Sequence, residues 1–262
     1  MISAERAIKT LQRDTTISSV LRAVLFGGMF AAAVTGVGIV PVMVLLGCGV
    51  AWAIVSMQAA RRSYLMGDSP SLIASGQYDE AEEQIEKEIR SFWQFKSVKL
   101  RGLHHLAVLR HAQRQWREAA ILSQAILRQR LTTMPGVART TRLMLADSLL
   151  ELGDLPGAHH ALLSMYAQKL SLNEAMNLLV VQLDYESRIG AWQAMLRNLA
   201  HKVQLAELMP SNSAARVQAM LALAARQDGK EELAQWLRRR AELLADVNEL
   251  TAHRPMLKQL WI

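Results

Sequence analysis

The chain has 262 residues, of which about half are hydrophobic and only 5% aromatic, and it contains a single cysteine. This length suits one domain with an appendage or two small domains, and the scarcity of Gly and Pro favours helix nearly throughout. One cysteine excludes an internal disulfide framework. The formal charge of +7 leaves lipid, acidic proteins and nucleic acids as partners to be weighed.

Residues 1–17 form the first predicted element, an amphipathic N-terminal segment. At helical spacing one of its faces is apolar, and Arg6, Lys9 and Arg13 lie elsewhere. Such a helix is expected to lie on the anionic cytoplasmic leaflet of a membrane. The alternative is that it simply extends the helix that follows. The residues of the apolar face are Ile2, Ala7, Ile8 and Leu11.

Residues 18–60 are predicted to form a two-helix transmembrane hairpin. No Asp, Glu, Lys or Arg occurs from residue 23 to residue 60. A single span needs about 20 apolar residues, so this run suits two short spans. The sequence TGVGIVP, residues 35–41, supplies glycines and a proline where the turn is needed. A cleaved signal peptide is the rival interpretation, but the apolar run is too long for one.

The charges that flank the hairpin predict its orientation. The first 62 residues hold six basic and two acidic side chains, and the turn between the two spans holds no positive charge. The positive-inside rule then places both termini in the cytoplasm. We therefore expect an integral protein of a bacterial inner membrane, with much of the positive charge close to lipid.

Five similar segments between residues 65 and 250 predict a helical repeat. They read GQYDEA (76–81), RQWREA (114–119), GDLPGA (153–158), GAWQAM (190–195) and GKEELA (229–234), and their last residues are 38, 39, 37 and 39 positions apart. Glycine supplies a turn conformation that other residues adopt at a cost. The third residue is an apolar plug, and a small last residue lets two helices approach closely. The residues expected to define the repeat are Gly76, Tyr78, Ala81, Trp116, Ala119, Gly153, Ala158, Gly190, Trp192, Gly229 and Ala234.

These segments resemble the turn of the tetratricopeptide repeat (TPR) family. GQYDEA matches that pattern closely, and residues 145–162 and 221–237 extend the match into the flanking helices. The period of about 38 exceeds the usual 34 of the family, and Met195 stands where alanine is expected. The resemblance implies an all-α fold, in which a TPR-like α-solenoid of about five helix-turn-helix units spans residues 65–250. It also implies that the first helix of each unit lines a groove, at about 97–113, 137–152, 173–188 and 213–226.

Charge within the solenoid is concentrated in its first units. Residues 79–90 carry a net charge of −4, whereas residues 96–142 carry +9. Arg110, Arg114 and Arg117 follow helical spacing and are predicted to form one basic ridge, and Glu82 is expected on the exposed face of the acidic helix. Three interpretations compete: solvated faces in which the acidic helix neutralises the basic one, contact of the basic residues with anionic lipid or an acidic partner, and nucleic-acid binding. Nucleic acid ranks last, because aromatics are not interleaved with the basic residues. The candidate partner-binding residues are Arg101, His105, Arg110, Arg142 and Asp147.

The last predicted element is the tail, residues 251–262. Pro255 interrupts it, and five apolar residues follow within the segment 256–262. Such a segment is too apolar for a free tail. It is expected to cap the open end of the array, or alternatively to dock onto a partner.

No convergent set of catalytic groups has a recognisable spacing. There is no phosphate-binding glycine loop and no nucleophile elbow, and His104 and His111 lack a third ligand at metal-binding spacing. The sequence therefore predicts no enzyme, no cofactor and no metal. The leading hypothesis is a membrane-anchored, TPR-like protein-interaction module that acts as a scaffold, recruitment or assembly factor. The alternative is a structural accessory subunit of a membrane complex, bound through the hairpin.

Overall fold

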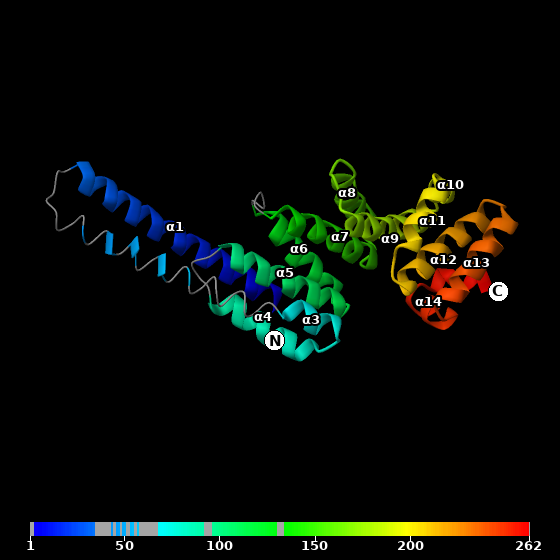
Figure 1. Ribbon diagram of the computed structural model, residues 1–262, viewed down its shortest axis with the longest axis horizontal. Coiled ribbons are helices and arrows are strands. Elements are labelled where there is room, and N and C mark those ends of the chain that lie inside the picture. The colour runs from blue at the N-terminus through cyan, green and yellow to red at the C-terminus, as the bar shows by residue number, and fades with distance from the viewer. Residues whose placement is uncertain are drawn as a thin grey trace. The chain divides into compact units, whose positions relative to one another are not determined.

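A computed structural model describes residues 3–34, 68–91, 96–129 and 134–261, together with residues 43, 46, 47, 49, 50, 53, 54 and 57. All regular structure within these residues is helical, as predicted (Figure 1). The chain divides into two compact units, residues 1–141 and 142–262. The helices are α1 (Ala4–Val34), α3 (Ser69–Ala74), α4 (Tyr78–Ser91), α5 (Lys96–Ala112), α6 (Trp116–Leu127), α7 (Pro135–Glu151), α8 (Leu155–Tyr166), α9 (Leu172–Arg188), α10 (Trp192–Leu196), α11 (Leu199–Glu207), α12 (Ser211–Gln227), α13 (Glu231–Leu244), α14 (Val247–His253) and the 3-10 helix η1 (Pro255–Trp261).

The five predicted turns share one backbone conformation. Each begins with a residue whose φ is positive, and each second helix starts two residues later. The amide after that residue donates to a carbonyl five residues back, for example Asp154 N to Leu149 O at 2.9 Å, as in a Schellman motif. The helix-turn-helix repeat is therefore confirmed at every predicted turn. The φ values are 78° at Gly76, 60° at Arg114, 78° at Gly153, 71° at Gly190 and 76° at Gly229.

The last position of each motif is buried, as the close approach of two helices requires. Ala81, Ala119 and Ala158 are fully inaccessible, and so is Met195, which replaces alanine in the fourth unit. Ala234 is 4% exposed. The plug positions are half-buried in the first four units, and Glu231 in the fifth is exposed. The small-residue pattern thus marks the contact between the helices of a pair.

The fourth pair departs from the others in its second helix. That helix breaks at Arg197 and Asn198 into α10 and α11, and Asn198 has a φ of 53°. Lys202 Nζ donates to the carbonyl oxygens of Ala194 (3.1 Å) and Met195 (2.9 Å). The lysine therefore caps the end of α10 by donating to two of its last carbonyl oxygens, of which Ala194 O also accepts from the amide of Arg197.

The first unit contains the beginning of α1, which packs against α5 and α6. Ala4, Ala7 and Leu11 are at most 3% exposed. Asp14 forms an ion pair with Lys99 of α5, and both side chains are almost completely buried. The prediction of a separate segment over residues 1–17 is corrected here, because α1 runs unbroken from Ala4 to Val34. Ala7 and Leu11 of the predicted apolar face are covered by protein, and Ile8 is half-buried.

The later part of α1 has a different surface. The large apolar side chains whose exposure is described there are 45% to 72% exposed, and those described between residues 43 and 57 are 52% to 64% exposed. No helix among the described residues is long and apolar enough to cross a membrane. The turn predicted at residues 35–41 lies outside the described residues. The exposed residues are Ile17, Val20, Val24, Phe26, Phe30, Met43, Leu46, Val50, Ile54 and Met57.

The second unit is built around α12. Nearly every side chain of this helix from Ala214 to Ala225 is buried, because α9, α10, α11, α13 and η1 all contact it. Methionines, leucines and alanines fill most of this core. A helix buried on all sides holds its neighbours in place, and it thereby positions the charged residues of α9 and the tail.

Candidate functional site

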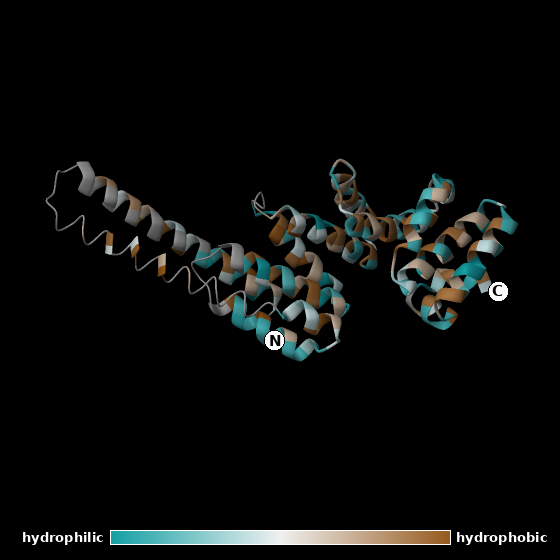
Figure 2. Cartoon of the chain, viewed as in Figure 1, coloured by the Kyte–Doolittle hydropathy of each residue, from teal (hydrophilic) through white to brown (hydrophobic). Residues whose placement is uncertain are grey.

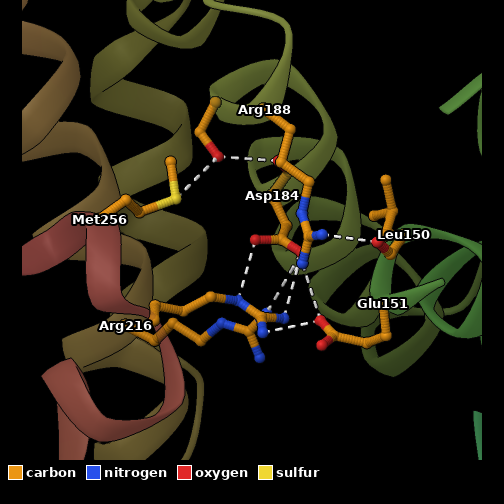
Figure 3. Close-up of polar contacts among 8 residues, drawn as sticks. Leu150, Glu151, Asp184, Arg188, Arg216 and Met256 are labelled. Carbon is orange, nitrogen blue, oxygen red and sulfur yellow. Dashed lines mark hydrogen bonds and ion pairs between the residues drawn. The ribbon is translucent and has the colours of Figure 1, made fainter. Parts of the chain in front are cut away.

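A cluster of six charged side chains lies in the second unit, and Figure 3 shows the contacts of Glu151, Asp184, Arg188 and Arg216 within it. We call it the charge cluster: Asp147 and Glu151 of α7, Asp184 and Arg188 of α9, Arg216 of α12, and Arg254, which follows α14. Residues four apart lie on one face of a helix, so α7 and α9 each contribute two adjacent groups. One oxygen from each of the three carboxylates lies within 4.8 Å of the other two.

Arg254 contacts two carboxylates of the charge cluster. Its Nε lies 2.9 Å from Asp184 Oδ1, and its Nη2 lies 3.1 Å from Asp184 Oδ2. Its Nη1 lies 2.7 Å from Glu151 Oε1. The guanidinium therefore forms ion pairs with both oxygens of one carboxylate and with one oxygen of a second, and its Nη2 also donates a hydrogen bond to Asp184 Oδ2.

The other two basic residues of the cluster lie within helices, Arg188 in α9 and Arg216 in α12. Arg188 Nη2 lies 2.8 Å from Glu151 Oε1 and 3.1 Å from Asp184 Oδ2, and its Nη1 donates to the carbonyl of Leu150 at 2.5 Å. Arg216 is more distant, with Nη2 at 3.9 Å from Asp184 Oδ2. Burial, and next the charge of Arg254, lower the pKa of Arg216, while the three carboxylates oppose that change.

The charges of the cluster are paired with one another. Asp184 is completely inaccessible, and a buried carboxylate is tolerated only when it is paired. Three acidic and three basic groups cancel within the charge cluster. Asp147, Glu151 and Asp184 are the residues that could hold a metal ion in the described part of the chain, but guanidinium groups already contact the oxygens of Glu151 and Asp184. We therefore assign no metal to them.

Arg254 begins a tail segment, residues 254–261, that packs on the last helix pair. Leu257 is fully buried and Leu260 is 3% exposed. Arg226 of α12 donates to the carbonyl of Gln259, and Arg238 of α13 donates to that of Leu260. Trp261 Nε1 donates to Glu242 Oε1 at 2.7 Å. The tail segment therefore covers the surface of the last helix pair, α12 and α13. This is the arrangement expected of a cap.

A second ionic network lies in the first unit, where it corrects two predictions. Arg110, predicted to bind a partner and to belong to a basic ridge with Arg114 and Arg117, is only 2% exposed. Its guanidinium pairs with Glu82 Oε1 at 2.9 Å and with Glu118 Oε2 at 3.1 Å. Glu82, expected on the wet face of α4, is likewise buried. The acidic helix, largely hydrophilic in Figure 2, thus neutralises the basic helix α5 directly.

The other predicted partner-binding residues have different environments. Arg101 is exposed on α5 and Arg142 is half-buried on α7. His105 is half-buried, with Nδ1 at 2.8 Å from Ser69 Oγ and 3.4 Å from Glu88 Oε2. Asp147 lies in the charge cluster. The structure therefore brings only Asp147, among the five, into the candidate site.

Sequence reasoning missed most members of the charge cluster. Glu151, Asp184, Arg188, Arg216 and Arg254 were not singled out. One signal was available: Asp147 and Glu151, like Asp184 and Arg188, stand four residues apart on helices predicted to face the groove. The contribution of Arg254 had no local signal, because it follows Asp184 by 70 residues.

The geometry stands without support from known proteins. No protein-family model, curated protein or solved structure matches this chain. The TPR resemblance therefore stays a prediction from the turn motifs. What the chain does has to be argued from α1, the repeated turns and the charge cluster.

Proposed function

We propose that this chain is a membrane-anchored, TPR-like module that binds a protein partner and acts as a scaffold, recruitment or assembly factor, without catalysis. The repeated turns support the first part, since stacked helix pairs offer extended surfaces to helices or peptides. The charge cluster supports the second, because its carboxylates hold guanidinium groups of other segments and it contains no nucleophile paired with a base. The partner is expected to be protein, and nucleic acid ranks last.

One observation carries the proposal of an anchor: the two unlike halves of α1. Ala4, Ala7 and Leu11 are buried within the first unit, whereas Val24 and Phe30 are 66% and 72% exposed. A soluble surface seldom leaves so many large apolar side chains in one stretch uncovered. We propose that α1 continues into the transmembrane hairpin of residues 18–60, in a bacterial inner membrane.

The flanking charges support a cytoplasmic location for both termini and for the helical repeats. Arg6, Lys9 and Arg13 before the hairpin, Arg22 close to its start, and the two arginines at positions 61 and 62 after it fit the positive-inside rule. Basic residues close to the hairpin would then meet anionic headgroups.

Cysteine labelling tests this topology. In a Cys48→Ser background, Gly38→Cys and Ile262→Cys are introduced separately and exposed to a membrane-impermeant maleimide on intact cells. We expect label at residue 38 from outside, and at residue 262 only after permeabilisation. Label at both sites from outside would overturn the orientation, and release of the chain by alkaline carbonate would overturn the anchor.

The alternative, a structural subunit bound through the hairpin, is favoured by four glycines. A Cβ added at Gly27, Gly28, Gly47 or Gly49 would meet no described atom within 4 Å. These glycines are therefore not required by packing that the structure describes, and small residues allow close approach of another helix. Mass measurement after gentle detergent extraction decides between the two. A stable complex of fixed stoichiometry supports the subunit, and a lone monomer supports the recruitment module.

A further inference from the structure

The tail segment, residues 254–261, contacts the second unit through the kinds of interaction that hold a bound peptide: hydrogen bonds to its main chain, buried apolar side chains and an ion pair. Arg226 and Arg238 donate to its main-chain carbonyls, which any sequence would offer. Two leucines, Leu257 and Leu260, are the buried anchors. Arg254 is the charged anchor, and its backbone is non-helical (φ −139°, ψ 86°) between α14 and η1. Pro255 then prevents α14 from continuing.

The charge cluster is incomplete without this segment. Asp147, Glu151 and Asp184 supply three negative charges, and Arg188 and Arg216 supply two positive charges from the helices. Arg254 supplies the third positive charge, and it alone contacts both oxygens of Asp184 at 3.1 Å or less. Without Arg254 the cluster holds three carboxylates and two guanidinium groups, and the completely buried Asp184 keeps the contacts of Arg188 and Arg216 at Oδ2 but loses the contact at Oδ1. Another guanidinium would restore that contact and balance the charge.

We propose that the charge cluster, with the adjoining surface of α12 and α13, is a binding site for an arginine-bearing peptide segment of a partner protein, and that the chain's own tail segment occupies it in this structure. The ligand carries an arginine followed, three and six residues later, by large apolar side chains, as Arg254 is followed by Leu257 and Leu260.

The tail segment then acts as a competitor in the same molecule. A tethered segment is present at an effective concentration of about millimolar. A partner segment binds when it outcompetes the tail or when the tail is released. This inference rests on the proposed function of a protein-interaction module, and it specifies the chemistry of the partner.

Peptide binding to the full-length chain in detergent micelles tests the site. The probe is a fluorescent peptide with the sequence of residues 251–262, and the tail is released by the double substitution Leu257→Asp/Leu260→Asp. We expect the probe to bind the released variant at least about tenfold more tightly than the wild type, in which the tethered tail competes. A peptide with alanine in place of the arginine should bind about tenfold more weakly, and a lysine version should fall between them.

Matched substitutions in the released variant locate the binding. Glu151→Gln should weaken the probe about tenfold. Glu207→Gln, an exposed acid elsewhere in the same unit, should leave it unchanged. Equal binding of the alanine peptide, equal binding to wild type and released variant, or no binding to a variant that retains its circular dichroism would each overturn the proposal. So would a wild-type dimer in which the tail of one copy crosslinks to the charge cluster of the other.

Hydrogen exchange on the wild type covers the case in which the released variant fails to fold. Amides of residues 257–260 should exchange together and at least about tenfold faster than those of α12, because the segment opens by itself. Exchange of both at the same rate would make the segment an integral part of the fold and overturn the proposal. Neither measurement depends on the membrane topology, so the two proposals fail separately.

Discussion

Substitutions at the positive-φ position of the five turns should change the free energy of unfolding in opposite directions, depending on whether glycine or arginine stands there. Four turns begin with glycine at positive φ, and the second begins with Arg114 at a φ of 60°. A Cβ added at Gly153 would meet no atom within 4 Å, so Gly153→Ala introduces backbone strain without a clash. Arg114→Gly removes the corresponding strain from the second turn. The two substitutions should therefore change stability in opposite directions.

The magnitude follows from two opposing effects. The left-handed conformation costs an ordinary residue about 1–2 kcal/mol. Replacing glycine by alanine recovers about 0.4–1 kcal/mol, since the unfolded chain becomes less flexible. The difference predicts that Gly153→Ala lowers the free energy of unfolding by about 1 kcal/mol. By the same reasoning, Arg114→Gly raises it by about 1 kcal/mol.

Urea unfolding in mild detergent, followed by circular dichroism, measures both effects. With a slope of about 1–3 kcal/mol per molar urea, the midpoints should shift by about 0.3–1 M in opposite directions. Gly136→Ala is the control, since Gly136 lies within α7 and its added Cβ also meets nothing within 4 Å. Alanine is the better helix former, so the control should be stabilising.

A neutral Gly153→Ala would refute the reasoning, because strain at positive φ is its only source. A destabilising Arg114→Gly would refute it as well. That result would mean that the side chain of Arg114 contributes more to stability than its backbone conformation costs.

Three further predictions concern buried ionisable groups of the first unit. Lys99→Met should destabilise the unit by about 3–5 kcal/mol in urea unfolding, because Asp14 is left buried and unpaired, and adding Asp14→Leu should restore most of the loss. Arg110→Met should cost a similar amount, whereas the exposed Arg101→Met should stay within about 0.5 kcal/mol; equal effects of the two would contradict the assigned burial. Burial, and next the neighbouring His105, lower the pKa of His104 to about 4. The unfolded chain therefore binds a proton first as pH falls, so stability should drop between about pH 6.5 and 4, and His104→Asn should reduce that drop in urea titrations at each pH.

The turns were predictable because their cause is local. Each motif spans six residues. Its glycine indicates the backbone conformation of the turn, and its apolar plug and small last residue indicate where the two helices pack closely. Where glycine was missing, at Arg114, the rest of the motif still located the turn. The break after Leu196 was harder to predict, since Met195 signalled a departure but not that the helix would stop there.

The ionic contacts were not predictable, because their partners are distant in sequence. Lys99 pairs with Asp14, 85 residues earlier, and Arg254 pairs with Asp184, 70 residues earlier. Helical spacing placed Arg110 on a basic ridge, but only tertiary packing shows that α4 covers it. A charged residue is usually exposed, so each buried one requires knowledge of which helix lies against it.

The uninterrupted course of α1 has a mechanical consequence. No loop separates the part packed on α5 and α6 from the part with exposed apolar side chains, and the buried Asp14 lies close to the transition. A helix bends little over such a length, so it acts as a lever whose short arm is clamped by Lys99. If the later part of α1 tilts or rotates, the part packed on α5 and α6 has to move with it, because no flexible loop lies between the two parts.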